Sequence, residues 1–216
     1  PSGWEETAVL LAGMLPDMTA FVEALLQVNP ALAARCIAES GGAPPGEATL
    51  AKVQEMLVVI ATSLTAPVEE RNAAGNALNF LGDPRPGVGV KKGLPDIAWC
   101  EVPAGEFLFL GDDINQDDDN KKTAHPLFLD SYEISKYPIT NAQYQVFLDD
   151  KGREGRTVPE RANHPVDGVT WYEADDFCRW LTEKLGRLVT LPTEAQWEKA
   201  ALGTDGRRYP WGPKVT

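Results

Sequence analysis

Hydrophobic residues recur at the spacing of an α-helix over the first part of the chain, up to about Leu81. The clearest stripe lies in residues 47–65, and its members stand at i, i+3, i+7, i+10 and i+14: Leu50, Val53, Leu57, Ile60 and Leu64. An α-helix has about 3.6 residues per turn, so these positions share one face. We predict a helix here that packs against its neighbours through this face.

Two further stretches show the same periodicity, and turn-forming residues separate the stretches from one another. One face of residues 18–28 carries Phe21, Leu25 and Val28. Further along, an apolar face made of Ala73, Ala77 and Phe80 leaves Asn72, Asn76 and Asn79 for a solvated face. The breakers are Pro16-Asp17, Asn29-Pro30, residues 41–46 and Ala66-Pro67. Such breakers predict several short helices joined by tight turns.

Short helices joined by Pro/Gly turns are typical of a stacked helical solenoid or a small bundle. Residues 68–85 resemble a HEAT-type repeat, in which an Arg and small residues on one helix precede a Leu-Gly-Asp-Pro turn, here residues 81–84. We therefore expect HEAT-like helical repeats over residues 1–82. An ordinary helical cap domain is the alternative.

The pattern changes after residue 82. Residues 82–95 contain four glycines and three prolines, too many breakers for a regular helix or strand, so we assign residues 83–98 to a linker. Residues 99–102 and 106–110 then alternate like strands around a turn at 103–105, which predicts a hairpin. Residues 127–135 are a candidate third strand.

Three later segments begin with a capping box, in which a Thr hydroxyl accepts from the N3 amide and the N3 side chain reaches back. The pairs are Thr140 with Gln143, Thr170 with Glu173 and Thr193 with Gln196. We expect a helix after each, the second ending at Gly186 and the third at Gly203. Strands followed by segregated helices predict an α+β fold for residues 99–216.

The chain of 216 residues carries 20 basic and 32 acidic side chains, a formal net charge of −12. Such a surface repels phosphate backbones and anionic lipids, so we expect no nucleic-acid or membrane partner. The longest apolar run, Met56–Ala61, is far too short to cross a bilayer. A signal peptide is either absent or already removed, and we expect the chain to be a fragment of a larger polypeptide.

Three cysteines lie far apart in the sequence: Cys36, Cys100 and Cys178. A sparse, odd set without a C-x-x-C motif favours reduced thiols over a disulfide framework. We therefore expect a cytoplasmic location.

Six sequence blocks in the second half resemble the formylglycine-generating enzyme (sulfatase-modifying factor) family in order and spacing. They are residues 103–111, 137–144, 164–172, 177–180, 191–201 and 209–212, the last reading Tyr-Pro-Trp-Gly. The resemblance implies a C-type-lectin-like fold over residues 99–216, incomplete at its C-terminus. In the enzymes of this family, two copper-binding cysteines oxidise a target cysteine to formylglycine. Those cysteines and the calcium ligands lie downstream of the last block, so neither copper nor calcium is assigned to this chain.

The remaining candidate residues are interpreted as structural, and no catalytic, cofactor-binding or metal-binding residue is assigned. Cys178 lies on the apolar face of its predicted helix and Cys100 precedes the predicted hairpin, so both are expected in the core. His125 and His164 each precede a proline and have no second ligand at metal-binding spacing.

Residues 112–120 hold a run of aspartates that resembles a calcium loop. Counted from Asp113, however, the pattern places Asp118 where an EF-hand needs Gly and Ala124 where it needs Glu. We expect a solvated acidic loop. Four tryptophans in the family blocks are expected to pack in the core: Trp171, Trp180, Trp197 and Trp211.

Two functional hypotheses follow. The first is a non-catalytic recognition or sensor module of a larger bacterial signalling or defence protein, which binds a protein or small-molecule ligand through its lectin-like domain. The alternative is a copper-dependent formylglycine-generating oxidase whose catalytic cysteines lie beyond residue 216. The related iron-dependent sulfoxide synthases carry a His-rich helical domain, and the absence of histidine before residue 125 counts against them.

Overall fold

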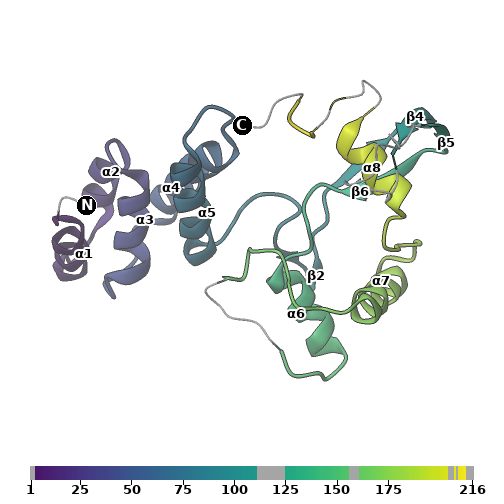
Figure 1. Cartoon of the computed structure of the whole chain (residues 1–216). Helices are drawn as coiled ribbons and strands as arrows, with labels where there is room; N and C mark the ends of the chain where they lie inside the picture. The colour runs from purple at the N-terminus through teal and green to yellow at the C-terminus, as the bar shows by residue number, and fades with distance from the viewer. Residues whose placement is uncertain (1–2, 111–124, 156–160, 204–206, 208, 213–216) are drawn as a thin grey trace. The chain divides into compact units, whose positions relative to one another are not determined.

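The computed structural model describes residues 3–110, 125–155, 161–203, 207 and 209–212 (Figure 1). The chain divides into two compact units. Unit 1 comprises Pro1–Asp96 and Pro138–Asp167, and unit 2 comprises Ile97–Tyr137 and Gly168–Thr216. Each unit is described separately below. The sequence boundary at residues 83–98 stays a prediction.

Unit 1 begins with five helices that end at the breakers seen in the sequence. They are α1 (Glu5–Met14), α2 (Thr19–Leu26), α3 (Pro30–Glu39), α4 (Glu47–Thr62) and α5 (Val68–Leu81). The start of α3 shows why: the Asn29 side chain accepts from the Leu32 amide at 3.0 Å, and Pro30 takes the first helical position, where no N–H is needed. The predicted short helices are confirmed, whereas their identity as HEAT-like repeats stays a prediction.

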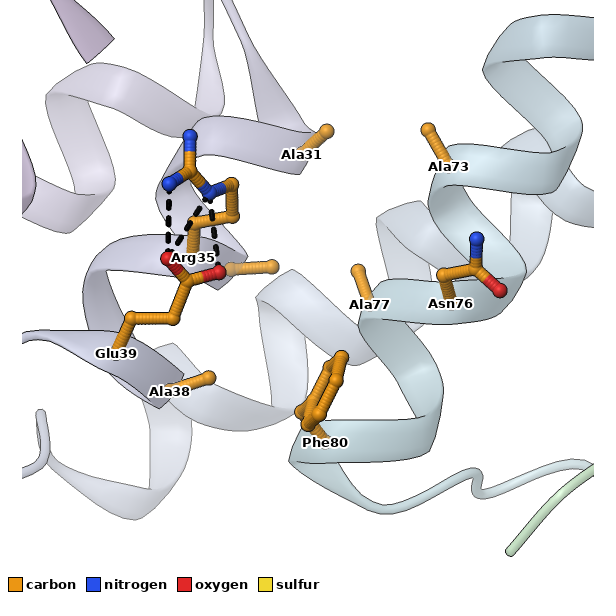
Figure 2. A pocket seen from close by; sticks show the side chains of 9 residues that line it. Ala31, Arg35, Ala38, Glu39, Ala73, Asn76, Ala77 and Phe80 are labelled. Atoms are coloured by element: carbon orange, nitrogen blue, oxygen red, sulfur yellow. Dashed lines mark hydrogen bonds and ion pairs between the residues drawn. The ribbon is translucent and has the colours of Figure 1, made fainter. Parts of the chain in front are cut away.

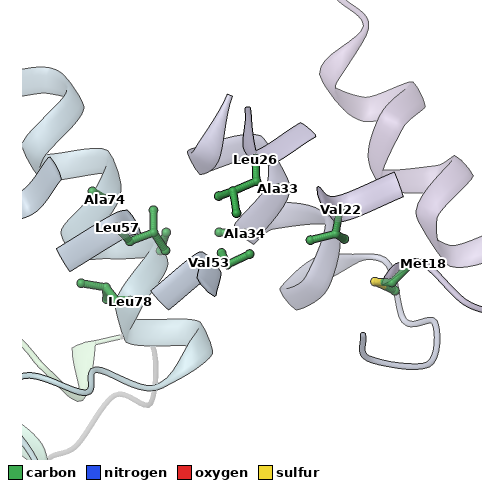
Figure 3. Close-up of a cluster of buried hydrophobic side chains, with 10 residues drawn as sticks. Met18, Val22, Leu26, Ala33, Ala34, Val53, Leu57, Ala74 and Leu78 are labelled. Atoms are coloured by element: carbon green, nitrogen blue, oxygen red, sulfur yellow. The ribbon is translucent and has the colours of Figure 1, made fainter. Parts of the chain in front are cut away.

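Helices α2 to α5 enclose a common apolar core, which Figure 3 shows in close-up, whereas α1 contributes to a separate, smaller cluster. Val53 and Leu57 of α4 are fully buried, as the stripe on residues 47–65 predicts. They meet side chains from α2, α3 and α5, and the whole cluster is Met18, Val22, Leu26, Ala33, Ala34, Val53, Leu57, Ala74, Ala77 and Leu78. Burial of several aliphatic side chains, at about 1.5–3 kcal/mol each, stabilises the stack.

Four of the predicted core positions are exposed instead: Val28, Leu64, Ala73 and Phe80. Leu64 and Val28 lie beyond the ends of α4 and α2, so their helical stripes do not reach them. On α5, Phe80 is 57% exposed, because the helix turns Ala74 and Leu78 toward the core. The predicted apolar face of α5 is therefore rotated from the face that is buried.

The glycine-rich stretch after α5 is more regular than its composition predicts. Strands β1 (Val90–Lys91) and β2 (Leu94–Pro95) pair antiparallel around Lys92 and Gly93, whose φ angles are 53° and 74°. Two successive residues with positive φ match the tight turns that join hairpin strands, and glycine adopts this conformation without strain.

Helix α6 (Asn141–Asp150) holds this stretch in place through its capping box. The Gln143 amide is fully buried and donates to the carbonyls of Gly87, Gly89 and Asp96 at 3.2, 3.1 and 2.7 Å. The Thr140 hydroxyl donates to the Val88 carbonyl at 2.8 Å. The same two side chains thus start a helix and bind a segment about fifty residues earlier.

Unit 2 contains four strands, β3 (Trp99–Val102), β4 (Gly105–Phe109), β5 (His125–Leu129) and β6 (Tyr132–Ser135). The predicted hairpin between residues 99–102 and 106–110 is wrong, because β3 pairs with β6 and β4 pairs with β5, both antiparallel. The predicted strand 127–135 is likewise two strands. Val102 pairs with Tyr132, and Gly105 pairs with Leu129, so one register continues across the interruption. The four strands form an interrupted two-stranded ribbon.

Two capped helices complete the described part of unit 2: α7 (Trp171–Leu185) and α8 (Glu194–Leu202). All three predicted capping boxes are confirmed. Helix α7 ends at Gly186, which is left-handed with φ of 65°. Mixed helices and strands agree with the α+β class, whereas a C-type-lectin-like topology stays a prediction. Among the described residues, no helix is long and apolar enough to span a membrane.

Candidate functional site

The cysteines occupy different environments. Cys178 is buried on the inner face of α7, as predicted, and burial, together with the nearby Asp175 carboxylate, raises the pKa of its thiol to about 11. Burial also raises the pKa of the Cys36 thiol. Cys100 is exposed on β3, so the expectation of a core position for it is wrong; its neighbour Trp99 is the half-buried one. A strand alternates its faces, and the sequence could not decide which residue points inward.

The two histidines belong to different units. His125 is exposed in β5, with its ring edge-on to Phe109 at 5.6 Å. His164 is half-buried, and its Nδ1 has no hydrogen-bond partner among the described residues. Nowhere in the described ranges do three or more His, Cys, Asp or Glu side chains gather as metal ligands. The acidic segment 112–120 lies outside the described residues.

The tryptophans of the family blocks are mostly exposed, which corrects the core interpretation. Only Trp180 is buried, at 1% exposure, whereas Trp171, Trp197 and Trp211 are 63%, 62% and 63% exposed. Regular placement in the sequence blocks carried no information about which face each residue occupies. Trp171 is the first residue of α7, where a side chain projects beyond the helix body.

The exposed aromatic residues are ordered by contacts with one another. Trp171 packs edge-on against Tyr172 at 5.4 Å between ring centroids, and Tyr172 is 78% exposed. Tyr209 and Trp211 are stacked at 5.4 Å with only 3° between their ring planes. Exposed aromatic faces of this kind are suited to stacking on ligand rings or apolar surfaces. We refer to Trp171, Tyr172, Trp197 and Trp211 as the exposed aromatic set.

A buried lysine that the sequence analysis missed supports α8. Lys199 is 1% exposed, and its ammonium donates to the carbonyls of Pro103 and Gly105 at 2.8 and 2.9 Å. A signal was present in the sequence: Lys199 stands between Ala195 and Leu202 at i+4 and i+7, on an otherwise apolar face. The two accepting carbonyls flank the bend between β3 and β4.

Two further hydrogen bonds fasten α8 to the ribbon. The Tyr132 hydroxyl donates to the Gln196 carbonyl at 2.5 Å, and burial raises the pKa of this tyrosine. The Leu110 amide donates to the Glu198 carboxylate at 2.6 Å. Because α8 is held at both ends of its inner face, Trp197 is kept on the outer face.

Comparison with known proteins identifies the family. The sequence profile of the FGE-sulfatase family, described as a sulfatase-modifying factor enzyme 1-like domain, matches residues 95–216. This match spans more than half of the chain, so the chain belongs to the FGE-sulfatase family.

Named relatives differ in their described activities. The chain is 30% identical over 180 residues to hercynine oxygenase of Mycolicibacterium thermoresistibile, an alignment that covers 63% of this chain and 39% of the relative. It is 32% identical over 137 residues to serine/threonine-protein kinase pkn1 of Chlamydia caviae, covering 53% and 21%. It is 43% identical over 63 residues to formylglycine-generating enzyme of Thermomonospora curvata, covering 29% and 19%. The chain thus spans between 19% and 39% of the length of these relatives.

The family resemblance raises the question of a copper site, and the described thiols do not fit one. Copper(I) prefers two thiolates close together. Cys178 holds its proton at neutral pH because its pKa is about 11, and Cys100 faces solvent from β3. The described arrangement therefore offers exposed aromatic faces on a fastened scaffold rather than a metal-binding thiol pair.

Proposed function

We propose that the FGE-sulfatase domain of this chain is a recognition module, which binds a protein or small-molecule ligand through the exposed aromatic set. The observation that carries the proposal is the exposure of Trp171 and Trp197, at 63% and 62%, on helices whose other faces are fixed. Exposed aromatic side chains that form a contiguous patch on a soluble domain often mark an interaction site. A role as sensor of a larger signalling or defence protein fits this proposal.

The scaffold behind these residues supports the proposal. Trp180 is fully buried on α7, and its ring centroid lies 5.6 Å from that of Phe177 on the same helix. Lys199 anchors α8 through two backbone carbonyls. Rigid placement lowers the entropy lost on binding, so aromatic side chains on such helices are effective ligand contacts.

The proposal is tested by binding selections on the purified chain. The probes are an oligosaccharide array and a phage-displayed peptide library, applied to the parent, to Trp197→Ala and to the double variant Trp171→Ala, Tyr172→Ala. We expect ligands whose affinity falls about tenfold or more in these variants, equivalent to about 1.4 kcal/mol. Leu64→Ala is the matched control, because Leu64 is 94% exposed and lies in unit 1. Ligands that bind all variants equally would contradict the proposal.

The alternative is a copper-dependent formylglycine-generating oxidase whose catalytic cysteines lie beyond residue 216; one relative is named formylglycine-generating enzyme and another hercynine oxygenase. It is tested by incubating the chain with copper(I) and a cysteine peptide carrying a sulfatase motif, followed by mass spectrometry. Aldehyde formation that is abolished by Cys178→Ser would replace the recognition proposal with an enzymatic one. Unchanged peptide would show that residues 1–216 alone do not carry out this reaction.

A further inference from the structure

Unit 1 contains a pocket of about 240 Å³ between α3 and α5, shown in Figure 2. The wall from α3 carries Ala31 and Arg35, and the wall from α5 carries Ala73, Ala77 and Phe80. Alanines line both walls, at positions 31, 34 and 38 on α3 and at positions 73 and 77 on α5, so the two helices leave an open groove between them. We call this feature the α3–α5 groove.

The α5 wall is the apolar face that the sequence predicted for this helix. Its members Ala73 and Phe80 are exposed, while the core takes Ala74 and Leu78 from the adjoining face. Part of the apolar surface of α5 therefore stays outside the core. Phe80, at 57% exposure, forms one edge of the groove and can close over an inserted side chain.

The margin of the groove carries an excess of negative charge. Arg35 is bound by two carboxylates, from Glu6 and Glu39, each at 2.8 Å from Nη2. Glu69 stands one turn before Ala73 on the same side of α5 and is exposed. Three carboxylates thus accompany one guanidinium, and a cationic partner is favoured there.

We propose that the α3–α5 groove binds a basic segment of a partner protein, which inserts one aromatic or long aliphatic side chain between the helices. An apolar cavity of about 150 Å³ accommodates benzene, so the larger volume of this groove accommodates an indole-sized group. Pockets for whole drug-sized molecules are usually about 300–1,000 Å³, which is larger than this groove. A second copy of the chain, with its net charge of −12, is repelled at this margin. This binding is separate from the role proposed for the aromatic set of unit 2.

The test uses the whole chain and a phage-displayed library of random dodecapeptides. Peptides eluted from the parent are counter-selected on Ala73→Leu, in which an added side chain fills the groove from an exposed position. Asn72→Leu is the matched control, since it adds the same side chain to the adjacent exposed position outside the groove. Far-ultraviolet circular dichroism checks that each variant keeps its helices.

We expect groove-dependent peptides that combine an aromatic or long aliphatic residue with Lys or Arg. Their affinity should fall about tenfold in Ala73→Leu and stay unchanged in Asn72→Leu. In Glu39→Gln, the affinity of these peptides should depend less on salt concentration. The proposal is overturned if no peptide distinguishes Ala73→Leu from Asn72→Leu, or if the groove-dependent peptides are acidic. Free indole that binds as tightly as the peptides would assign the groove to a small molecule. Self-association that is lost in Ala73→Leu would assign it to a second copy.

Discussion

The ammonium of Lys199 lies 2.9 Å from the carbonyl oxygen of Gly105, at the point where the ribbon bends from β3 to β4. A second carbonyl, that of Pro103, accepts from the same ammonium at 2.8 Å. Both oxygens belong to the turn that the sequence assigned to a hairpin. The cation thus donates to a carbonyl on each side of Ala104 and thereby fixes the bend.

Lys199→Met should lower the free energy of unfolding of unit 2 by about 2–3 kcal/mol, the range for losing hydrogen bonds to a charged group. The variant keeps the apolar stem but leaves the Pro103 and Gly105 carbonyls unsatisfied. Urea denaturation monitored by tryptophan fluorescence measures this free energy of unfolding, because five of the six tryptophans belong to unit 2. Lys184→Met is the control, since that side chain is exposed and lies 5.9 Å from the Trp180 ring. Equal losses in both variants would show that Lys199 is not an anchor.

Trp197→Ala and Trp180→Ala should differ strongly in stability. Trp180 is 1% exposed, so its removal opens a cavity and should cost about 3–5 kcal/mol. Trp197 is 62% exposed, so its removal should cost less than about 1 kcal/mol. Thermal unfolding monitored by circular dichroism gives both values. A large loss in Trp197→Ala would place its indole in a packed interface and remove it from the exposed aromatic set.

Local signals in this sequence predicted local structure well. Each Thr at a capping box, Gly186 at a helix end and Asn29-Pro30 at a helix start act through neighbours within four residues, so the sequence alone contains the necessary information. The pairing of strands depends instead on residues far along the chain. The partner of β3 is β6, and the sequence of residues 99–110 does not indicate this pairing.

Side-chain exposure was the other limit of prediction. A helix such as α5 has two adjoining apolar faces, Ala73-Ala77-Phe80 and Ala74-Ala77-Leu78, and only packing against α3 and α4 selects one. The same holds for the tryptophans, of which one is buried and three are exposed. Lys199 was missed because a buried lysine is rare and its acceptors lie about a hundred residues earlier.

Gln143→Leu should destabilise unit 1 by about 2–4 kcal/mol, because it places an apolar side chain at a buried position and removes the hydrogen bonds that the Gln143 amide donates to three carbonyls. These are the carbonyls of Gly87, Gly89 and Asp96. Hydrogen exchange should accelerate in residues 87–96, where the Asp96 amide donates to Gly89. Gln145→Leu is the control: the Gln145 amide donates to the exposed Asp149 carboxylate and not to residues 87–96, so this variant should leave the exchange unchanged. Unaltered protection in Gln143→Leu would contradict the anchoring role of α6.

The three thiols should react at different rates with a maleimide under native conditions. Cys100 is exposed and should be labelled first, whereas Cys36 and Cys178 are buried and have raised pKa values. Mass spectrometry of timed samples measures the order. Cys100→Ser should abolish the fast phase, and a fast phase that persists in this variant would show that a buried thiol is accessible.

Titration of Cys178 also gives a pH dependence of stability. Its ordinary pKa of 9.0 rises to about 11 in the folded chain. Above pH 9.0 the unfolded chain releases a proton that the folded chain retains, so this stabilisation is complete below pH 9.0 and is lost as the pH rises toward 11. Stability of Cys178→Ala should therefore fall less steeply between pH 9 and 11 than that of the parent.

The register of the ribbon is continuous, so the effect of an insertion between β3 and β4 depends on whether it adds an odd or an even number of residues. Residues 103 and 104 separate β3 from β4 without being paired, yet Val102 with Tyr132 and Gly105 with Leu129 keep the same alignment. Alternation along a strand means that one residue inserted at this point would leave β3 in place and turn Phe107 outward from β4. Two inserted residues would return it to the buried face. Lineages of this domain are thus expected to change length here by pairs of residues.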